Sequence, residues 1–181
     1  MKKVLIIATD GFEQSELMEP KARLEDADVA VTIASLDTDD INGWDDGQWG
    51  ESVAVDLTVD DVNVEEYDAL LLPGGQINPD VLRMNDAVIE IIQEFNGQAK
   101  PIAAICHAPW LLVEADIIAG KVVTSWPSLR TDLRNAGGEV VDQKVAVDGN
   151  IITSRNPDDI PAFTDALMDA LSLNERVSEN A

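Results

Sequence analysis

Apolar residues follow two different patterns along this chain. Four short runs are almost uninterrupted in their apolar character, at residues 4–8, 29–34, 69–72 and 102–105. Runs of this length, rich in Val, Ile and Leu, are typical of parallel strands that are covered on both faces. Two other stretches repeat apolar residues at helical spacing, at Val88, Ile91, Ile92 and Phe95 and at Ile160, Phe163, Leu167 and Leu171. Their alternation predicts an α/β fold, with a mostly parallel central sheet and helices on both faces.

Two further segments predict β-hairpins. Residues 39–56 combine three glycines and two tryptophans with the alternating pair Val53 and Val55. Residues 145–147 and 151–152 are apolar and flank Asp148-Gly149-Asn150, which is a strong turn signal. No repeat, linker or low-complexity block interrupts the chain, so we predict one domain over residues 1–173 and a tail at residues 174–181.

The charge of the chain is strongly negative. Of its 181 residues, 45% are hydrophobic and 26% charged, as in an ordinary globular domain, but 35 Asp and Glu oppose 12 Lys and Arg for a net charge of −23. A field of this sign repels nucleic acid phosphates and anionic lipid head groups, so we expect neither nucleic acid nor membrane as a partner. The acidic residues are spread along the chain, which favours adaptation to a salty cytoplasm. An acidic protein from a low-salt organism is the alternative.

The first residues resemble a signal peptide only in their charge. Lys2 and Lys3 precede an apolar run, but that run ends at Ala8 and is followed by Asp10 and Glu13, so it is too short for a signal peptide. No segment reaches the roughly 18 apolar residues of a membrane span. We therefore expect a cytoplasmic protein with a reduced thiol.

The only cysteine and the only histidine of the chain are neighbours, Cys106 and His107. One cysteine forms no disulfide within the chain, and the two residues are too few for a zinc site, so we expect no metal and no other cofactor. They follow the apolar run at 102–105, and Pro109 suits the first turn of a helix. Cys106 is thus predicted on a strand-to-helix turn of the kind that presents the nucleophile in α/β hydrolases.

A cysteine at this turn has two interpretations. The positive end of a helix lowers the pKa of a thiol, and its free N–H groups bind an oxyanion, which would make Cys106 a nucleophile. Cysteine is also among the residues most often buried, so a structural thiol is the alternative. His107 either assists Cys106 or only hydrogen-bonds a backbone carbonyl.

Two other segments are predicted at the same edge of the sheet. Glu13 and Glu16 follow the first strand and share a helix face at i, i+3 spacing, where open α/β sheets bind ligands. We interpret Glu13 as a residue that complements the helix dipole. Gly74 and Gly75 follow the strand at 69–72, and their paired amides serve either a tight turn or an oxyanion hole.

Three motifs in order make the chain similar to the DJ-1/PfpI family and to its PfpI-like branch. They are residues 11–17, residues 68–75 and the segment 104–109 around Cys106, and the resemblance extends over residues 2–173. It implies a flavodoxin-like three-layer sandwich with a small β-hairpin, within the wider superfamily of class I glutamine amidotransferase-like proteins. It also implies a catalytic group of Cys106, His107 and a protonated Glu16. The amides of Gly75 and His107 would then hold an oxyanion, and Gly74 and Trp126 would line the pocket.

The resemblance further implies homo-oligomers, dimers or hexamers, in which an acidic residue of a neighbouring subunit orients the histidine. The matching position is Asp80, in a loop that has one extra residue here and where Asp is shorter than the usual Glu. Three other positions depart from the family's pattern: Gln76 replaces a basic residue, Trp126 a Tyr, and Ala108 a Gly. These departures weaken the expectation of peptide hydrolysis more than that of thiol reactivity.

The function that the resemblance implies is that of a cysteine-dependent hydrolase. Its substrate would be a small reactive carbonyl compound, a glycation adduct or a peptide, attacked by the Cys106 thiolate. The alternative is a non-enzymatic redox sensor or stress-protective protein whose Cys106 is oxidised to a sulfinate. A glutamine amidotransferase needs a second, remote histidine, and the chain has none, so we exclude that class.

Adaptation to high salt predicts that the fold depends on salt. At ~1 M salt the Debye length shrinks to about 3 Å, which removes most of the self-repulsion of the charged surface. We expect far-UV circular dichroism and activity to weaken in low salt and to recover in molar KCl. Identical spectra and activity under both conditions would contradict the adaptation.

Overall fold

The computed structural model of the chain describes residues 1–172. The tail that the sequence predicts at residues 174–181 lies outside the described residues, as does residue 173, where the predicted domain ends.

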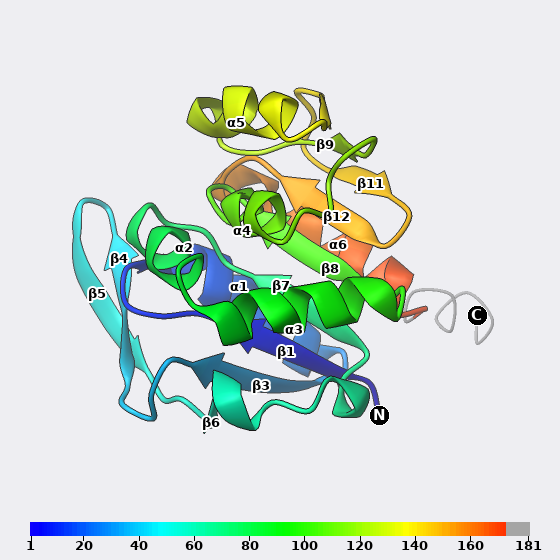
Figure 1. Cartoon of the computed structure of the whole chain (residues 1–181). Coiled ribbons are helices and arrows are strands. Elements are labelled where there is room, and N and C mark those ends of the chain that lie inside the picture. Colours follow the sequence, from blue (N-terminus) through cyan, green and yellow to red (C-terminus); the bar gives the residue numbers. More distant parts are fainter. Residues whose placement is uncertain (173–181) are drawn as a thin grey trace.

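A seven-stranded sheet forms the centre of the molecule (Figure 1). Its strands are β1 (Lys3–Ile7), β3 (Ala30–Ser35), β6 (Leu57–Thr58), β7 (Ala69–Leu72), β8 (Ile102–Ile105), β11 (Ala146–Asp148) and β12 (Ile151–Ser154). They lie in the order β11-β12-β8-β7-β1-β3-β6. Every neighbouring pair is parallel except β11 with β12.

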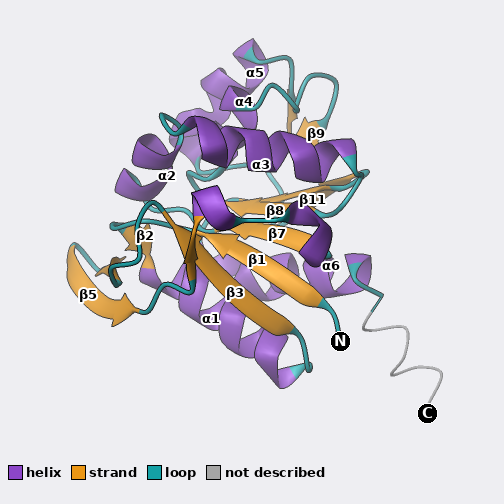
Figure 2. Ribbon diagram, turned by 60° about the horizontal axis from the view of Figure 1, so that its bottom comes forward, coloured by secondary structure: helices purple, strands orange, loops and turns teal. Residues whose placement is uncertain are grey.

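Helices cover both faces of this sheet. On one face lie α1 (Gln14–Asp26) and α6 (Ile160–Ala170), and on the other α3 (Asp86–Gly97) and α4 (Pro109–Glu114), as Figure 2 shows for α1, α3 and α6. The longest of them, α1, has 13 residues. Within residues 1–172, no helix has the length and hydropathy that crossing a membrane requires.

Alternate residues of the central strands pack into two separate hydrophobic cores, one on each face of the sheet. In β1, Leu5 and Ile7 pack on the side of α3, whereas Val4 and Ile6 pack on the side of α1 and α6. All four side chains are completely buried. This burial on both faces is the physical reason why the strand is an uninterrupted apolar run rather than an alternating one.

Smaller elements surround the central sheet. A three-stranded sheet contains β2 (Phe12–Glu13), β4 (Ile41–Asp45) and β5 (Gln48–Val53), and a two-stranded one contains β9 (Val122–Val123) and β10 (Glu139–Val140). Two short helices are α2 (Ile77–Leu82) and α5 (Arg130–Asn135). Short 3-10 turns occur at Val59–Asp61, Val64–Glu66, Pro127–Leu129 and Pro157–Asp159.

The predicted α/β fold is confirmed. β7 and β8 coincide with the apolar runs at 69–72 and 102–105, and β1 and β3 differ from the predicted bounds by one residue at each end. Both hairpins are present, β4 with β5 and β11 with β12, and the second one turns at Gly149 and Asn150. The strands β2, β6, β9 and β10 were not predicted, because two residues are too few to show a period.

The order of the strands decides where a site can form. The five central parallel strands run β12-β8-β7-β1-β3, which is the flavodoxin order, and the direction of winding reverses between β1 and β7. Ligands of such sheets bind outside the carboxyl ends of the strands at this reversal. The segments that follow β1, β7 and β8 carry Glu16, Gly74 and Cys106, so the topology brings these predicted site residues to one edge.

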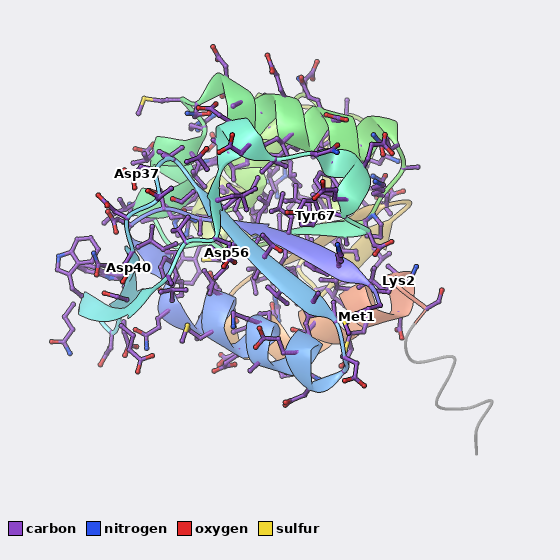
Figure 3. All side chains as sticks on the ribbon, turned by 90° about the horizontal axis from the view of Figure 1, so that it is seen from below. Met1, Lys2, Asp37, Asp40, Asp56 and Tyr67 are labelled. Atoms are coloured by element: carbon purple, nitrogen blue, oxygen red, sulfur yellow. The ribbon has the colours of Figure 1, made fainter. Side chains whose placement is uncertain are left out.

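The acidic residues of the loop between β3 and β4 lie at the molecular surface. Asp37 and Asp40 are exposed there (Figure 3). Their placement agrees with a solvated acidic surface, and the dependence on salt stays a prediction.

Candidate active site

Cys106 occupies a sharp turn between β8 and α4. Its φ angle is +65°, a left-handed conformation that residues with a side chain rarely adopt. Two backbone hydrogen bonds hold the turn: the N–H of Cys106 donates to the carbonyl oxygen of Ser154 (3.0 Å), and its own carbonyl oxygen accepts from the N–H of Trp126 (2.9 Å). Pro109 begins α4. The predicted strand-to-helix turn is confirmed, and Cys106 on it is 5% exposed.

His107 faces the thiol. Its Nδ1 atom lies 3.1 Å from Sγ of Cys106, so the ring contacts the sulfur and not a backbone carbonyl. The ring stacks on Trp126, with centroids 5.7 Å apart and planes 21° apart, and meets Trp110 edge-on at 5.3 Å. Burial lowers the pKa of His107 below its ordinary value of 6.5. The imidazole is therefore neutral at neutral pH, and Nδ1 is able to accept a proton in the tautomer that carries hydrogen on Nε2.

Glu16 reaches the same site from the first turn of α1 and is completely buried. Its Oε1 atom accepts a hydrogen bond from the N–H of Gly74 (3.1 Å). Its Oε2 atom is buried without a partner of ideal hydrogen-bond geometry, although the carboxyl group interacts with the thiol of Cys106.

The carboxyl group of Glu16 holds its proton unusually tightly. Burial is the largest cause that raises the pKa of Glu16 to about 8, and the charge of Glu13 acts in the same direction. The N–H of Gly74 and the contact with Cys106 oppose this rise without cancelling it. At neutral pH Glu16 is mostly protonated, as the resemblance implied.

The thiol of Cys106 is harder to ionise than the sequence predicted. Burial, the largest influence, raises its pKa, and an ionised Glu16 raises it as well. Hydrogen bonds from the N–H groups of Gly75 and His107 lower it but do not outweigh burial. The expectation that the helix terminus and its free N–H groups give Cys106 a lowered pKa is therefore wrong, because the sulfur lies in a nearly dry site and burial outweighs these groups. A proton on Glu16 removes the repulsion, so the two groups titrate as a coupled pair.

The loop after β7 packs so closely against these side chains that it requires glycine. At Gly74, a Cβ atom would lie 2.6 Å from Oε1 of Glu16 and 2.7 Å from Cβ of Cys106. At Gly75, where φ is +88°, a Cβ atom would lie 2.6 Å from the backbone nitrogen of Glu13. The two glycines thus form a tight turn, and the N–H of Gly75 also reaches the sulfur.

Asn78 supports this loop, and sequence reasoning did not identify it. The residue is completely buried. Its Nδ2 atom donates to the carbonyl oxygens of Pro73 (2.9 Å) and Gly74 (3.2 Å), and its Oδ1 atom accepts from the N–H of Thr9 (2.8 Å). The side chain thereby ties the loop after β7 to the end of β1. Its one sequence signal, an Asn directly before Pro79, commonly marks an ordinary turn.

Glu13 lies beside the site, at the residue that caps α1, but its side chain makes no capping hydrogen bond. Burial raises its pKa, and the charge of Asp45 raises it further. A carboxylate that complemented the helix dipole would show the opposite direction, so that interpretation is not supported. The effect of Glu13 is instead to repel charge on Glu16 and Cys106.

Of two further residues that the sequence analysis assigned to the site, Trp126 contacts His107 and Asp80 does not. Trp126 is 39% exposed and stacks on His107, where a wall of the site was expected. Asp80 is exposed on α2 and, within the described chain, forms no hydrogen bond or ion pair with His107. Its action on a neighbouring subunit, and homo-oligomerisation itself, stay predictions.

The surroundings of the site include a small pocket of about 100 Å³, lined by Gly11, Trp44, Gln76 and Ile77, beside the loop that carries Gly75. Residues 1–172 contain no group of three or more His, Cys, Asp or Glu side chains able to hold a metal ion. The arrangement that the structure does provide is a thiol that contacts both a neutral imidazole and a buried carboxylic acid.

Comparison with known proteins gives consistent matches over nearly the whole chain. A sequence model described as the DJ-1/PfpI family matches residues 2–170. The chain is 42% identical over 161 residues to the protein named Deglycase PfpI of Pyrococcus furiosus, covering 89% of this chain and 94% of the relative. It is 40% identical over 163 residues to the Putative cysteine protease YraA of Bacillus subtilis, covering 90% and 94%. Among solved structures, DJ-1beta of Drosophila melanogaster matches with a TM-score of 0.85 and 26% identity over 97% of both chains. The names of the curated relatives support a hydrolase or deglycase activity, which is the class of enzyme that the sequence predicted.

The raised pKa of Glu16 predicts that stability depends on pH. An unfolded glutamate ionises near pH 4.5 and the buried one near about 8, so between these values only the unfolded chain has lost the proton. The free energy of unfolding therefore falls as pH rises through this window, by on the order of 5 kcal/mol in total. Glu16→Gln removes this contribution. We expect urea titrations to show the variant gaining stability relative to the wild type from pH 4.5 to about 8.

The matched control is Glu19→Gln, which changes an exposed glutamate on the same helix. The pH trend of Glu16→Gln is measured relative to this variant. A difference between the two variants that does not change with pH would contradict the raised pKa.

Proposed function

The chain belongs to the DJ-1/PfpI family, and from this membership and the geometry around Cys106 we propose that it is a cysteine-dependent deglycase. Its substrates are adducts that small reactive carbonyl compounds form with amines. The observation that carries the proposal is the contact of Sγ of Cys106 with Nδ1 of His107 at 3.1 Å, beside a completely buried Glu16. The deglycase and protease names of the curated relatives support the same class of chemistry.

Cys106 is the nucleophile and His107 the base in this proposal. Because the pKa of the thiol is raised, a standing thiolate is scarce, and the proton leaves during the attack. A bond forms between Sγ and the electrophilic carbonyl carbon while the thiol proton passes to Nδ1 of the neutral His107. The carbonyl electron pair moves onto its oxygen. His107 then gives this proton to the amine nitrogen on the adjacent carbinol carbon, and the C–N bond breaks as the hydroxyl group of that carbon becomes a carbonyl group. Collapse of the oxyanion breaks the C–S bond and releases the carbonyl compound, and the proton of the former hydroxyl group restores the thiol.

The negative oxygen of this intermediate needs donors close to the sulfur. The N–H groups of Gly75 and His107 already hydrogen-bond Sγ in the resting site, so they lie next to the atom that the substrate carbon joins. Backbone donors held rigidly in a dry site stabilise developing charge strongly. The close packing of Gly74 and Gly75 keeps this loop in place.

Glu16 acts as an acid in contact with the sulfur. In its protonated form it adds no negative charge beside the thiol, and its O–H is a donor to sulfur as negative charge develops there. An ionised carboxylate at the same place would disfavour the same charge. Reactivity is therefore expected to decline when Glu16 ionises.

A small carbonyl adduct fits this site better than a peptide does. Within the described chain, the ring of His107 has Cys106 as its one hydrogen-bond partner, and no carboxylate holds its second nitrogen. Peptide hydrolysis depends on a well-oriented base that protonates a poor leaving group. Adducts of reactive carbonyl compounds are more electrophilic than a peptide bond, and their amine leaves more easily.

The test compares two substrates with and without the nucleophile. The protein is incubated with the methylglyoxal adduct of acetylarginine and, separately, with a fluorogenic peptide, each against Cys106→Ala. We expect release of acetylarginine that Cys106→Ala abolishes, and little peptide cleavage. Adduct turnover that persists in Cys106→Ala would contradict the proposal. Absence of turnover together with quantitative oxidation of Cys106 to a sulfinate would favour the redox sensor instead.

Variants of Glu16 test the role of its proton. Glu16→Gln keeps a donor to the sulfur and carries no charge, whereas Glu16→Leu has similar bulk and no donor. We expect the pH dependence of Cys106 alkylation by iodoacetamide to stay near that of the wild type for Gln and to shift to higher pH for Leu. Superimposable profiles for the two variants would show that the acid does not act through the sulfur.

A further inference from the structure

The orientation of His107 rests on aromatic contacts within the chain. Sγ of Cys106 is the only hydrogen-bond partner of the imidazole among the described residues. A ring with one such bond is free to turn away from it unless other contacts resist the rotation. Here two indole rings supply these contacts, with Trp126 stacked on the imidazole and Trp110 meeting it edge-on.

Of the two indoles, that of Trp110 is the one that a side-chain hydrogen bond holds in place. Its Nε1–H donates to Oδ2 of Asp132 on α5, at 2.9 Å. The guanidinium of Arg83 also lies over the indole, 5.8 Å from the ring centroid, and forms an ion pair with Glu114 at 3.0 Å. Trp110 thus contacts Asp132 on α5 and Arg83 directly after α2, and these two helices flank α4 in Figure 1. Within residues 1–172, no such side-chain bond holds the ring of Trp126, which is 39% exposed.

We propose that Trp110, anchored by Asp132, is a positioning residue that keeps Nδ1 of His107 facing Sγ of Cys106. The contacts run without a break from Asp132 at the surface of α5 through the indole to the imidazole. Loss of the anchor frees the indole to rotate, and the imidazole then loses the edge contact that resists its own rotation. This inference rests on the proposed function in one respect, that His107 receives the thiol proton.

The proposal separates two ways of orienting the same ring. In the first, the chain orients its own histidine through Trp110. In the second, Asp80 of a neighbouring subunit would do so across an interface. Asp132 and Asp80 lie on different helices, α5 and α2, so a substitution at one leaves the other unchanged.

The single histidine of the chain makes the test direct, because the imidazole gives one set of nuclear magnetic resonance signals. We compare the wild type with Asp132→Ala, which removes the acceptor, and with Asp132→Asn, which keeps an oxygen at the same place. Trp110→Phe keeps an aromatic ring but loses the N–H. Trp49→Phe is the matched control, since it deletes the indole of an exposed tryptophan on β5 that contacts Trp44 and not His107.

We expect Asp132→Ala and Trp110→Phe to shift and broaden the His107 ring signals and to slow the alkylation of Cys106 about tenfold at neutral pH. Asp132→Asn should restore most of both, and Trp49→Phe should change neither. Circular dichroism identifies any variant that unfolds, and the conservative variants Asp132→Asn and Trp110→Phe then decide the outcome.

His107 signals and alkylation rates that match the wild type in folded Asp132→Ala and Trp110→Phe would overturn the proposal. So would an Asp80→Asn variant that moves the His107 signals while the Asp132 variants do not. The resonance readout does not depend on turnover, so a wild-type protein without deglycase activity would contradict the proposed function and leave the positioning role to be decided by the spectra.

Discussion

The protonation of Glu16 beside Cys106, in a nearly dry pocket, governs this site. Glu16 and Cys106 are both acids, both almost excluded from water, and close enough that a charge on one disfavours a charge on the other. In such a pair the first proton to leave belongs to the pair and not to either residue. Burial keeps this proton in place at neutral pH, whereas the N–H groups of Gly75 and His107 favour its loss from the sulfur. The chemistry available to Cys106 therefore depends on whether Glu16 keeps its proton.

The fold brings this pair together at the ends of three neighbouring strands. β1, β7 and β8 end at the edge where the sheet reverses its winding, and each delivers one part: the acid on α1, the glycine loop and the thiol. The positive φ of Cys106 is strained, and the backbone bonds to Ser154 and Trp126 offset that strain. Asn78 joins two of the three segments through its side chain. A Cβ atom at Gly74 would intrude on both acids, so the smallest residue is a condition for their contact.

The sequence was informative where a local pattern reflects a global constraint. Strands buried on both faces must be continuously apolar, which is why β7 and β8 were predicted to the residue, and Pro109 marked the helix that follows Cys106. The sequence did not predict side-chain contacts that depend on residues far away in the chain. That His107 turns toward the sulfur, that Asn78 bridges two loops and that Trp110 is anchored by Asp132 are consequences of packing between segments far apart in the chain. The direction of the pKa of Cys106 was predicted wrongly for the same reason: a helix terminus is visible in sequence, whereas the depth of burial is not.

The central claim is that Glu16 is a neutral carboxylic acid in the resting site, beside a thiol that also keeps its proton. Difference infrared spectroscopy of the wild type against Glu16→Gln at neutral pH distinguishes a carboxylic acid from a carboxylate at this position. The account predicts a carboxylic acid C=O band that only the wild type shows, and its conversion to carboxylate bands as the pH is raised through about 8. Carboxylate bands of Glu16 already present at neutral pH, with no carboxylic acid band, would contradict it.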